Sequence, residues 1–297
     1  MRIKRDYMGN DQLLPAYNKM LVLQTDFGLV DGAVSAMHGV AHTVASDIQV
    51  SDLTHEIPPY DIWNASYRLY QTIKYWPADT VFVSVVDPGV GSARRSIAVK
   101  TKSGHYVITP DNGTLTHIYK YEGVEAVRVI DENKNRLPHS QESNTFHGRD
   151  VYAYNGALLA SGQVAFEELG EDVPVDSLVT LPVIEPRLQG DTAVGTIDVL
   201  DVRFGSLWTN IPLEMVKELS IDRGDSLLVT ILHQNVAVYQ EQIPFVRSFA
   251  EVNLGQPLVY INSLVNIGIA LNQESFAAVH HIGIGTDWQV KISKVNK

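Results

Sequence analysis

Aspartate residues follow three predicted β-strands in the first half of the chain. Asp26, Asp87 and Asp111 each stand where a short apolar run ends. In open α/β sheets the ligand lies outside the carboxyl ends of the strands, so these carboxylates are placed for chemistry. Arg94 follows Asp87 by seven residues, across a turn forced by a Pro-Gly pair. A carboxylate could orient water or accept its proton, and a guanidinium could stabilise the developing negative charge. The alternative is a plain Asp-Pro-Gly turn.

His147 is the other candidate for proton chemistry. It stands just ahead of a helix that is expected to run from about residue 145 to Ser161, with Gly162 after its end. The partial positive charge of a helix N-terminus disfavours imidazolium, so the ring stays neutral and can accept a proton. For a lone histidine, a packing or surface role is the alternative.

The elements that must position these residues alternate between strand and helix. The run at 81–86 carries no charge, Gly or Pro, which indicates a strand buried on both faces, as in parallel sheets. Other strands are expected at 21–24, 48–50, 96–100 and 106–108, and further helices at 32–45 and 62–75. We therefore predict an α/β catalytic domain over residues 20–182, with a mainly parallel sheet flanked by helices.

Short strands separated by turn residues fill the last third of the chain. They are expected at 193–199, 226–233, 235–239, 258–261, 267–271, 277–282 and 289–292, with turns at 201–210 and 261–263. This spacing predicts a smaller all-β, barrel-like domain over residues 192–297. The Pro-containing stretch from 182 to 192 marks the boundary. Residues 1–19 are polar and aperiodic, which predicts a loosely held N-terminal extension.

Composition excludes several classes of function. The 297 residues include no cysteine, so disulfides and thiolate chemistry are excluded. The net charge of −11, without a basic run, argues against a nucleic-acid partner and suits a cationic small molecule. No apolar run approaches the ~18 residues of a membrane span, and no signal peptide is evident. We expect a soluble, cytoplasmic protein that does not bind membranes.

Two other patterns suggest chemistry that we do not favour. Gly89-Val90-Gly91 follows a strand like a dinucleotide-binding loop, but the next residues alternate like another strand and a third glycine is missing. His38 and His42 have the spacing of a zinc-binding pair, but the glutamate of the protease motif is absent. We expect helix packing for these histidines, and no metal site.

Six segments, in order along the chain, resemble those of a known family. They are Thr25-Asp26-Phe27-Gly28, Asp52-Leu53-Thr54-His55-Glu56-Ile57, Val86-Asp87-Pro88-Gly89-Val90-Gly91, Pro110-Asp111-Asn112-Gly113, Phe146-His147-Gly148-Arg149-Asp150 and Asp201-x-x-Phe204-Gly205-x-x-x-Thr209-Asn210. Together they resemble the S-adenosyl-L-methionine (SAM) hydroxide adenosyltransferases, the hydrolase relatives of fluorinase and chlorinase. The likeness extends from about Met20 to the C-terminus.

The resemblance implies a fold, an assembly and a reaction. The fold is an N-terminal α/β domain with a C-terminal β-barrel. The assembly is a homotrimer whose active sites lie between the N-terminal domain of one subunit and the C-terminal domain of the next. In the reaction, a water-derived hydroxide attacks C5′ of SAM and gives adenosine and L-methionine. SAM is the substrate, and no cofactor is implied.

The resemblance also assigns residues to the site. The catalytic triad carries over to Asp87, Arg94 and His147. Asp26 is similar to the ligand of the ribose diol, and Asp31 and Asp201 to acids that hold the methionine end. The remaining substrate-binding positions carry over to Tyr60, Ser206, Trp208, Asn210 and Ser263.

The sequence departs from the family pattern at three positions, and two alternatives to the hydrolase stay open. Ser206 stands where Asn is usual, Gly268 replaces a frequent Glu, and Ala33 takes the place of a serine of the halogenases. One alternative is a SAM-dependent nucleoside halogenase, and the other is a non-catalytic binder of adenosine or SAM. A halide 4 Å from an ionised Asp87 would be repelled by about 4 kcal/mol at an effective dielectric near 20, which disfavours the halogenase.

Overall fold

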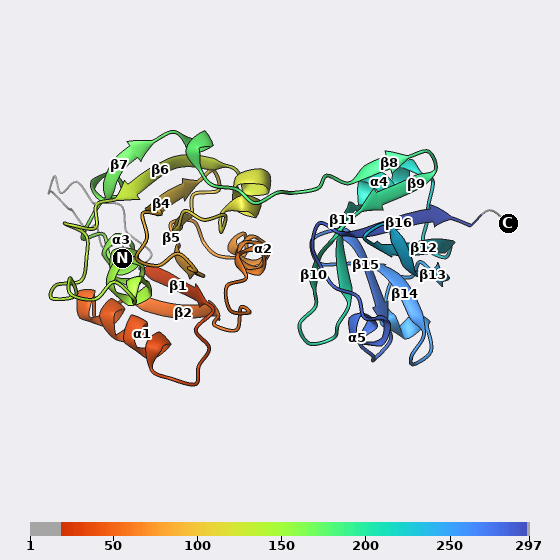
Figure 1. Ribbon diagram of the computed structural model, residues 1–297, viewed down its shortest axis with the longest axis horizontal. Helices are drawn as coiled ribbons and strands as arrows, with labels where there is room; N and C mark the ends of the chain where they lie inside the picture. The colour runs from red at the N-terminus through yellow and green to blue at the C-terminus, as the bar shows by residue number, and fades with distance from the viewer. Residues whose placement is uncertain (1–18, 296–297) are drawn as a thin grey trace, which may run out of the picture. The chain divides into compact units, whose positions relative to one another are not determined.

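A seven-stranded mixed β-sheet organises the first half of the chain. The computed structural model describes residues 19–295 and divides them into two compact units, which meet at Leu181 and Pro182 along the chain (Figure 1). Each unit is described by itself. Apart from Lys19, the predicted extension over residues 1–19 lies outside the described residues.

The sheet of the first unit has the strand order β2-β1-β3-β5-β4-β6-β7. Its strands are β1 (Met20–Thr25), β2 (Gln49–Thr54), β3 (Val81–Val85), β4 (Ser96–Thr101), β5 (Tyr106–Pro110), β6 (Val124–Ile130) and β7 (Gly170–Val173). As predicted for the central run, every residue of β3 is buried. The prediction of a mainly parallel sheet is wrong, because the pairs among β2, β1, β3 and β5 are parallel and those among β5, β4, β6 and β7 are antiparallel. The tight turn after Asp87 leads straight back into β4, which leaves no room for a crossover helix.

Helices cover both faces of this sheet, and alternate residues of the central strands face each side. Leu21 and Val83 pack with helices α1 (Ala33–Val44) and α3 (Tyr154–Ala160), whereas Val22 and Phe82 pack with α2 (Ile62–Ile73). This alternation is the period of two that a strand imposes. A π-helical turn, η2 (Gly148–Ala153), precedes α3, and η1 (Ile118–Glu122) has the same geometry. The short 3-10 turns η3 (Phe166–Glu168) and η4 (Val175–Ser177) flank β7.

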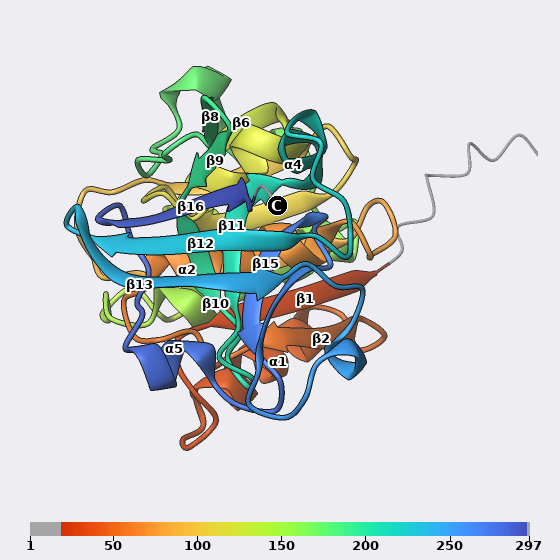
Figure 2. The same cartoon turned by 90° about the vertical axis from the view of Figure 1, so that its right-hand side faces the viewer.

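The second unit consists of two antiparallel sheets. One has the order β10-β11-β15-β14 and the other β13-β12-β16-β9-β8; Figure 2 shows β13, β12 and β16 of the larger sheet side by side. The strands are β8 (Arg187–Gln189), β9 (Thr192–Gly195), β10 (Ile197–Leu200), β11 (Leu207–Pro212), β12 (Ser226–His233), β13 (Val236–Pro244), β14 (Pro257–Ile261), β15 (Asn266–Leu271) and β16 (Trp288–Lys294). Residues from both sheets share one apolar core, and closure into a barrel stays a prediction.

Four details of the second unit differ from the sequence prediction. The expected strand at 277–282 is helix α5 (Phe276–His280), because the Ser275 side chain caps its first turn and His281 adopts the left-handed conformation that ends it. The turn expected at 201–210 is shorter than predicted, because it ends at Ser206 and β11 begins at the next residue. The expected strand at 193–199 breaks at Thr196 into β9 and β10, which belong to different sheets. Helix α4 (Leu213–Glu218) was not predicted.

No helix among residues 19–295 is long and apolar enough to cross a membrane.

Two helical glycines provide a test of the packing of the first unit. A Cβ at Gly156 in α3 would lie 2.5 Å from Cγ2 of Val83, whereas a Cβ at Gly39 in α1 would meet no atom within 4 Å. We expect Gly156→Ala to lower the free energy of unfolding by about 1–2 kcal/mol, because overpacking outweighs the helix-propensity gain. Gly39→Ala, the matched control, should raise it by about 0.5–1 kcal/mol. Urea unfolding of both variants measures the difference, and equal stabilisation by both would contradict the packing.

Candidate active site

The turn after β3 brings Asp87 and Arg94 together. The backbone reverses at Asp87, whose carbonyl accepts from Val90 N at 3.2 Å. Gly91 has φ +77°, and a Cβ there would lie 2.9 Å from the carbonyl oxygen of Asn144. Only glycine fits this close approach without strain, because L side chains rarely adopt positive φ. Arg94 then lies two residues before β4, with its side chain directed back toward the end of β3.

Asp87, Arg94 and His147 are in direct contact. Arg94 Nε donates to Asp87 Oδ1 at 2.9 Å, and Arg94 Nη2 donates to Asp87 Oδ2 at 2.5 Å. The same Nη2 lies 3.1 Å from His147 Nδ1. The side chains of Asp87 and Arg94 are only 5% and 11% exposed. The structure therefore brings together the three residues that the sequence predicts as a triad, in a nearly dry setting.

Behind Arg94 lies a second layer of polar residues that the sequence analysis missed. Arg94 Nη1 donates to Ser96 Oγ at 2.9 Å, and Ser96 Oγ donates to Glu132 at 2.6 Å. The Tyr152 hydroxyl lies 3.0 Å from Ser96 Oγ, and the guanidinium lies over the Tyr152 ring. Burial of the phenol raises the pKa of Tyr152 far above its usual range, so Tyr152 is neutral. These contacts fix the plane of the guanidinium.

The contact with Arg94 also determines the tautomer of His147. A guanidinium can only donate, so Nδ1 of His147 must accept and its proton lies on Nε2. Nε2 is buried and has no hydrogen-bond partner among the described residues. Burial holds the pKa of His147 below its usual value, opposed by the nearby carboxylate of Glu132 and reinforced by the charge of Arg94. His147 is therefore a neutral imidazole at pH 7; the sequence analysis expected this from the helix N-terminus, whereas burial is the main cause.

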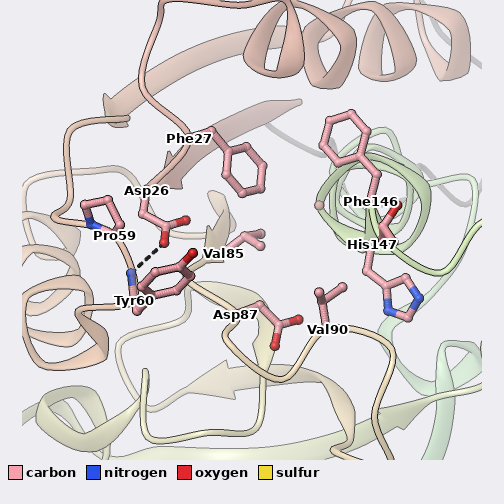
Figure 3. A pocket seen from close by; sticks show the side chains of 11 residues that line it. Asp26, Phe27, Pro59, Tyr60, Val85, Asp87, Val90, Phe146 and His147 are labelled. Atoms are coloured by element: carbon pink, nitrogen blue, oxygen red, sulfur yellow. Dashed lines mark hydrogen bonds between the residues drawn. The ribbon is translucent and has the colours of Figure 1, made fainter.

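Asp87 and His147 line a cavity of about 350 Å³ in the first unit (Figure 3). Its other lining residues are Asp26, Phe27, Pro59, Tyr60, Val85, Val90, Thr145, Phe146 and Gly148. Asp26 Oδ2 accepts from the backbone N–H of Tyr60 at 2.9 Å, and Tyr60 has φ +68° with its ring exposed. The sequence analysis singled out Asp26 and Tyr60, but missed the aromatic pair of Phe27 and Phe146. The signal was available, because each phenylalanine adjoins a predicted site residue.

Asp31 lines an adjoining hollow of about 560 Å³. The two spaces share Phe27, Thr145 and Phe146 as lining residues. Asp31 Oδ1 accepts from the backbone N–H of Ala33 at 2.8 Å, at the start of α1. Asp26 and Asp87 therefore line the cavity and Asp31 lines the hollow beside it, and we refer to the two together as the recess.

Asp111, the third acidic strand end, does not join this recess. Its carboxylate pairs with Arg95 and accepts from the backbone N–H of Val179 at 2.9 Å. Arg95 in turn donates to Ser177 Oγ and so attaches the segment around η4 to the end of β5. Asp111 thus has a structural role, although its sequence context is like that of Asp87.

The other five predicted site residues lie in the second unit. Asp201 Oδ1 accepts from the backbone N–H groups of Arg203 and Phe204, at 3.0 Å each, and so holds the loop before β11. Asn210 is buried, and its side chain joins Thr196 N to the carbonyl of Ile184. This amide therefore positions backbone. Ser263 is exposed in the turn between β14 and β15.

Tyr260 links two of the three departures from the family pattern, Ser206 and Gly268. A Cβ at Gly268 would lie 2.5 Å from two ring carbons of Tyr260, so this ring occupies the space of any side chain at 268. The phenol oxygen lies beside the side chains of Ser206 and Trp208, and burial raises the pKa of Tyr260. The two departures are therefore parts of one local arrangement around a tyrosine that the sequence analysis did not single out.

Comparison with known proteins gives the family. The models described as SAM hydroxide adenosyltransferase N-terminal domain and C-terminal domain match residues 21–170 and 195–289. The (R)-S-adenosyl-L-methionine hydrolase of Methanocaldococcus jannaschii is 35% identical over 250 residues, 82% of this chain and 84% of that protein. A fluorinase of Nocardia brasiliensis is 26% identical, over 92% of this chain and 97% of its own length.

A solved structure has the same fold. An uncharacterized conserved protein from Thermotoga maritima superimposes with a TM-score of 0.83 at 31% sequence identity, covering 92% of this chain and 100% of that one. The matched models cover most of the chain, and the named hydrolase is well above 30% identical to it. The chain therefore belongs to the SAM hydroxide adenosyltransferase family.

Proposed function

We propose that this protein hydrolyses SAM to adenosine and L-methionine, with Asp87, Arg94 and His147 as its catalytic residues. The contact among these three side chains, of which Asp87 and His147 line one cavity, carries the proposal. The cavity volume of about 350 Å³ is within the range of small-molecule sites. Relatives at 35% identity are named (R)-SAM hydrolases, so we take the R epimer at sulfur as the substrate.

Proton acceptance falls to Asp87 on geometric grounds. Four hydrogen bonds occupy four of the five N–H groups of Arg94, and Glu132 lies 4.0 Å from the nitrogen that carries the fifth. His147 has no free lone pair, because Nδ1 accepts from Arg94 and Nε2 carries the proton. The Asp87 oxygens retain lone pairs beside the cavity. Asp87 therefore orients the attacking water and takes its proton, while Arg94 stabilises the charge through Asp87.

The bond changes need no acid for the leaving group. The water oxygen forms a bond to C5′ as the C5′–S bond breaks, and the electron pair of that bond stays on sulfur. The sulfonium becomes the neutral thioether of methionine. Because the anionic nucleophile and the cationic sulfonium neutralise each other, a dry site favours the reaction. Positioning for in-line attack supplies most of the remaining acceleration.

The substrate-binding roles are part of the proposal. Asp26 holds the ribose diol with the lone pairs that Tyr60 N leaves free, and Tyr60 covers the nucleoside. Asp31 and Asp201 hold the ammonium end of methionine. Ser206, Trp208 and Ser263 belong to the same substrate site, and Asn210 contributes to it by positioning backbone. We further propose that residues 20–182 and 192–297 form a catalytic and a β-barrel domain, and that the protein is a homotrimer with sites at subunit interfaces.

The first prediction concerns the source of the oxygen. Incubation with each sulfur epimer of SAM in oxygen-18 water should place the label in the 5′-hydroxyl of adenosine, with the R epimer turned over faster. Mass spectrometry of the nucleoside measures this. Chloride-dependent formation of 5′-chloro-5′-deoxyadenosine would instead identify a halogenase. Calorimetric binding without any product would identify a non-catalytic binder.

The second prediction separates the two Asp–Arg pairs. Asp87→Asn should lower kcat by about 10²–10⁴-fold, the usual range for loss of a general base. Asp111→Asn removes the charge from the neighbouring pair with Arg95, outside the cavity, and should leave kcat within about twofold while lowering stability. Steady-state rates are compared at a temperature at which circular dichroism shows both variants folded. An equal loss of kcat in the two variants would remove Asp87 from the chemistry.

The third prediction is a pH dependence. Because the pKa of His147 lies below its usual value of about 6.5, kcat/KM should be constant from pH 8 to about 6.5 and fall at lower pH. Protonation of Nδ1 would make it a donor facing the Arg94 donor, and the hydrogen bond between the two side chains would break. His147→Asn keeps an acceptor near Nδ1 that cannot be protonated, so the fall below pH 6.5 should disappear. An unchanged profile in the variant would show that another group causes the fall.

A further inference from the structure

Two histidines and one aspartate converge at the edge of the first unit, outside the cavity. His38 comes from α1, Asp52 from β2 and His55 from the loop after β2. His38 Nε2 lies 2.8 Å and His55 Nε2 lies 3.0 Å from the same oxygen, Asp52 Oδ1. The three possible ligand atoms all lie within 4.8 Å of one another. The helix-packing role expected for His38 therefore does not account for its contact with Asp52.

We propose that His38, Asp52 and His55 bind a divalent transition-metal ion, with Zn²⁺ as the best fit. Two imidazoles and one carboxylate are ligands that zinc accepts at about 2.0–2.2 Å, with a fourth position open to water. Ligand atoms around a tetrahedral ion of this size lie about 3.3 Å apart, so the distances of 2.8 and 3.0 Å from the two imidazole nitrogens to Asp52 Oδ1 would lengthen by only a few tenths of an ångström. His38 and Asp52 are 30% and 40% exposed, which gives an ion access and lets both side chains adjust.

His55 has the surroundings of a fixed ligand. Its side chain is 2% exposed, and Nε2 makes no hydrogen bond of good geometry within the described part of the chain, despite its closeness to Asp52. Its other ring nitrogen, Nδ1, lies 2.8 Å from Thr25 Oγ1. Metal-ligating histidines characteristically have their second nitrogen held in this way, which fixes the ring and its tautomer. When the ion binds Nε2, the ring proton lies on Nδ1 and is donated to Thr25.

The site is joined to the segment that lines the cavity. Thr25 Oγ1 also accepts from the backbone N–H of Phe27 at 3.1 Å, and Gly28 N donates to the His55 carbonyl at 2.8 Å. Asp26 and Phe27 lie between these two attachments and line the cavity. An ion that immobilises His55 therefore stabilises this segment from behind. The inference itself does not depend on the proposed hydrolase activity.

The alternative without an ion is a His–Asp–His group in which His38 donates to Asp52 and His55 Nε2 lies beside the same oxygen. His42 provides the control that separates the two. It lies on the same helix four residues after His38 and is exposed, but it is not part of the cluster. Four residues is the spacing that first suggested zinc in the sequence, so the structure replaces the His38–His42 pair with a different ligand set.

The test is a zinc titration of the full chain, without a polyhistidine tag, by isothermal titration calorimetry. Wild type and His42→Ala should bind one zinc ion per chain with the same affinity, and zinc should raise their Tm. His38→Ala should bind at least tenfold more weakly and show no rise in Tm. Asp52→Asn should behave like His38→Ala, which provides a second variant if one folds poorly.

Two results would contradict the zinc proposal. Absence of saturable binding in a folded wild type at 100-fold molar excess of zinc would overturn the proposal and leave the hydrogen-bonded group. Equal binding by His38→Ala and His42→Ala would overturn it as well, because the zinc would then lie on other histidines. Neither calorimetry nor Tm measures the turnover of SAM, so failure of the zinc proposal can be distinguished from failure of the proposed function.

Discussion

The buried ion pair of Asp87 and Arg94 is the interaction on which the rest of the site depends. Taking two charges out of water is costly, and removing one partner of a buried pair destabilises a protein by about 3–5 kcal/mol. Such a pair is maintained only when its remaining donors and acceptors are satisfied. Ser96 satisfies one Arg94 donor and His147 another, so both residues are attached to the pair. The chain builds this unit from β3, β4 and the π-helical turn η2.

The satisfied guanidinium has a chemical consequence. With its donors used within the protein, Arg94 acts on the cavity mainly through the carboxylate that it holds. In the proposed mechanism, Asp87 is then the member of this cluster that can accept from a nucleophilic water in the cavity. A neutral His147 contributes shape and a proton on Nε2 without adding charge. Asp87, Arg94 and His147 together thus carry no net charge, and in the proposed reaction the leaving group departs uncharged.

The sequence predicts best those features that depend on residues close together in the chain. The burial of β3, the strand-end position of Asp87 and the neutral ring at the helix start all follow from short segments, and the structure agrees. The pairing of Arg94 with His147 spans 53 residues and required six segments taken together. Asp111 shows the limit, since its acidic strand end has the same local appearance as that of Asp87 but pairs with Arg95.

What the sequence could not predict depends on tertiary contacts. Ser96 has the appearance of an ordinary strand residue, Glu132 of a loop residue and Tyr152 of a core aromatic, yet all three surround Arg94. Likewise, α5 contains residues typical of a strand, but the N-terminal cap by Ser275 favours a helix. The part that Tyr260 plays is recognised only in the structure, where its ring fills the space above Gly268.

The central claim is that the carbon under attack lies opposite Asp87. A crystal structure of the protein with adenosine bound tests this most directly. The account predicts the ribose against Asp26 in the cavity of the first unit, with the 5′-oxygen within hydrogen-bonding distance of the Asp87 carboxylate. Adenosine bound elsewhere, or with its 5′-oxygen directed away from Asp87, would contradict it.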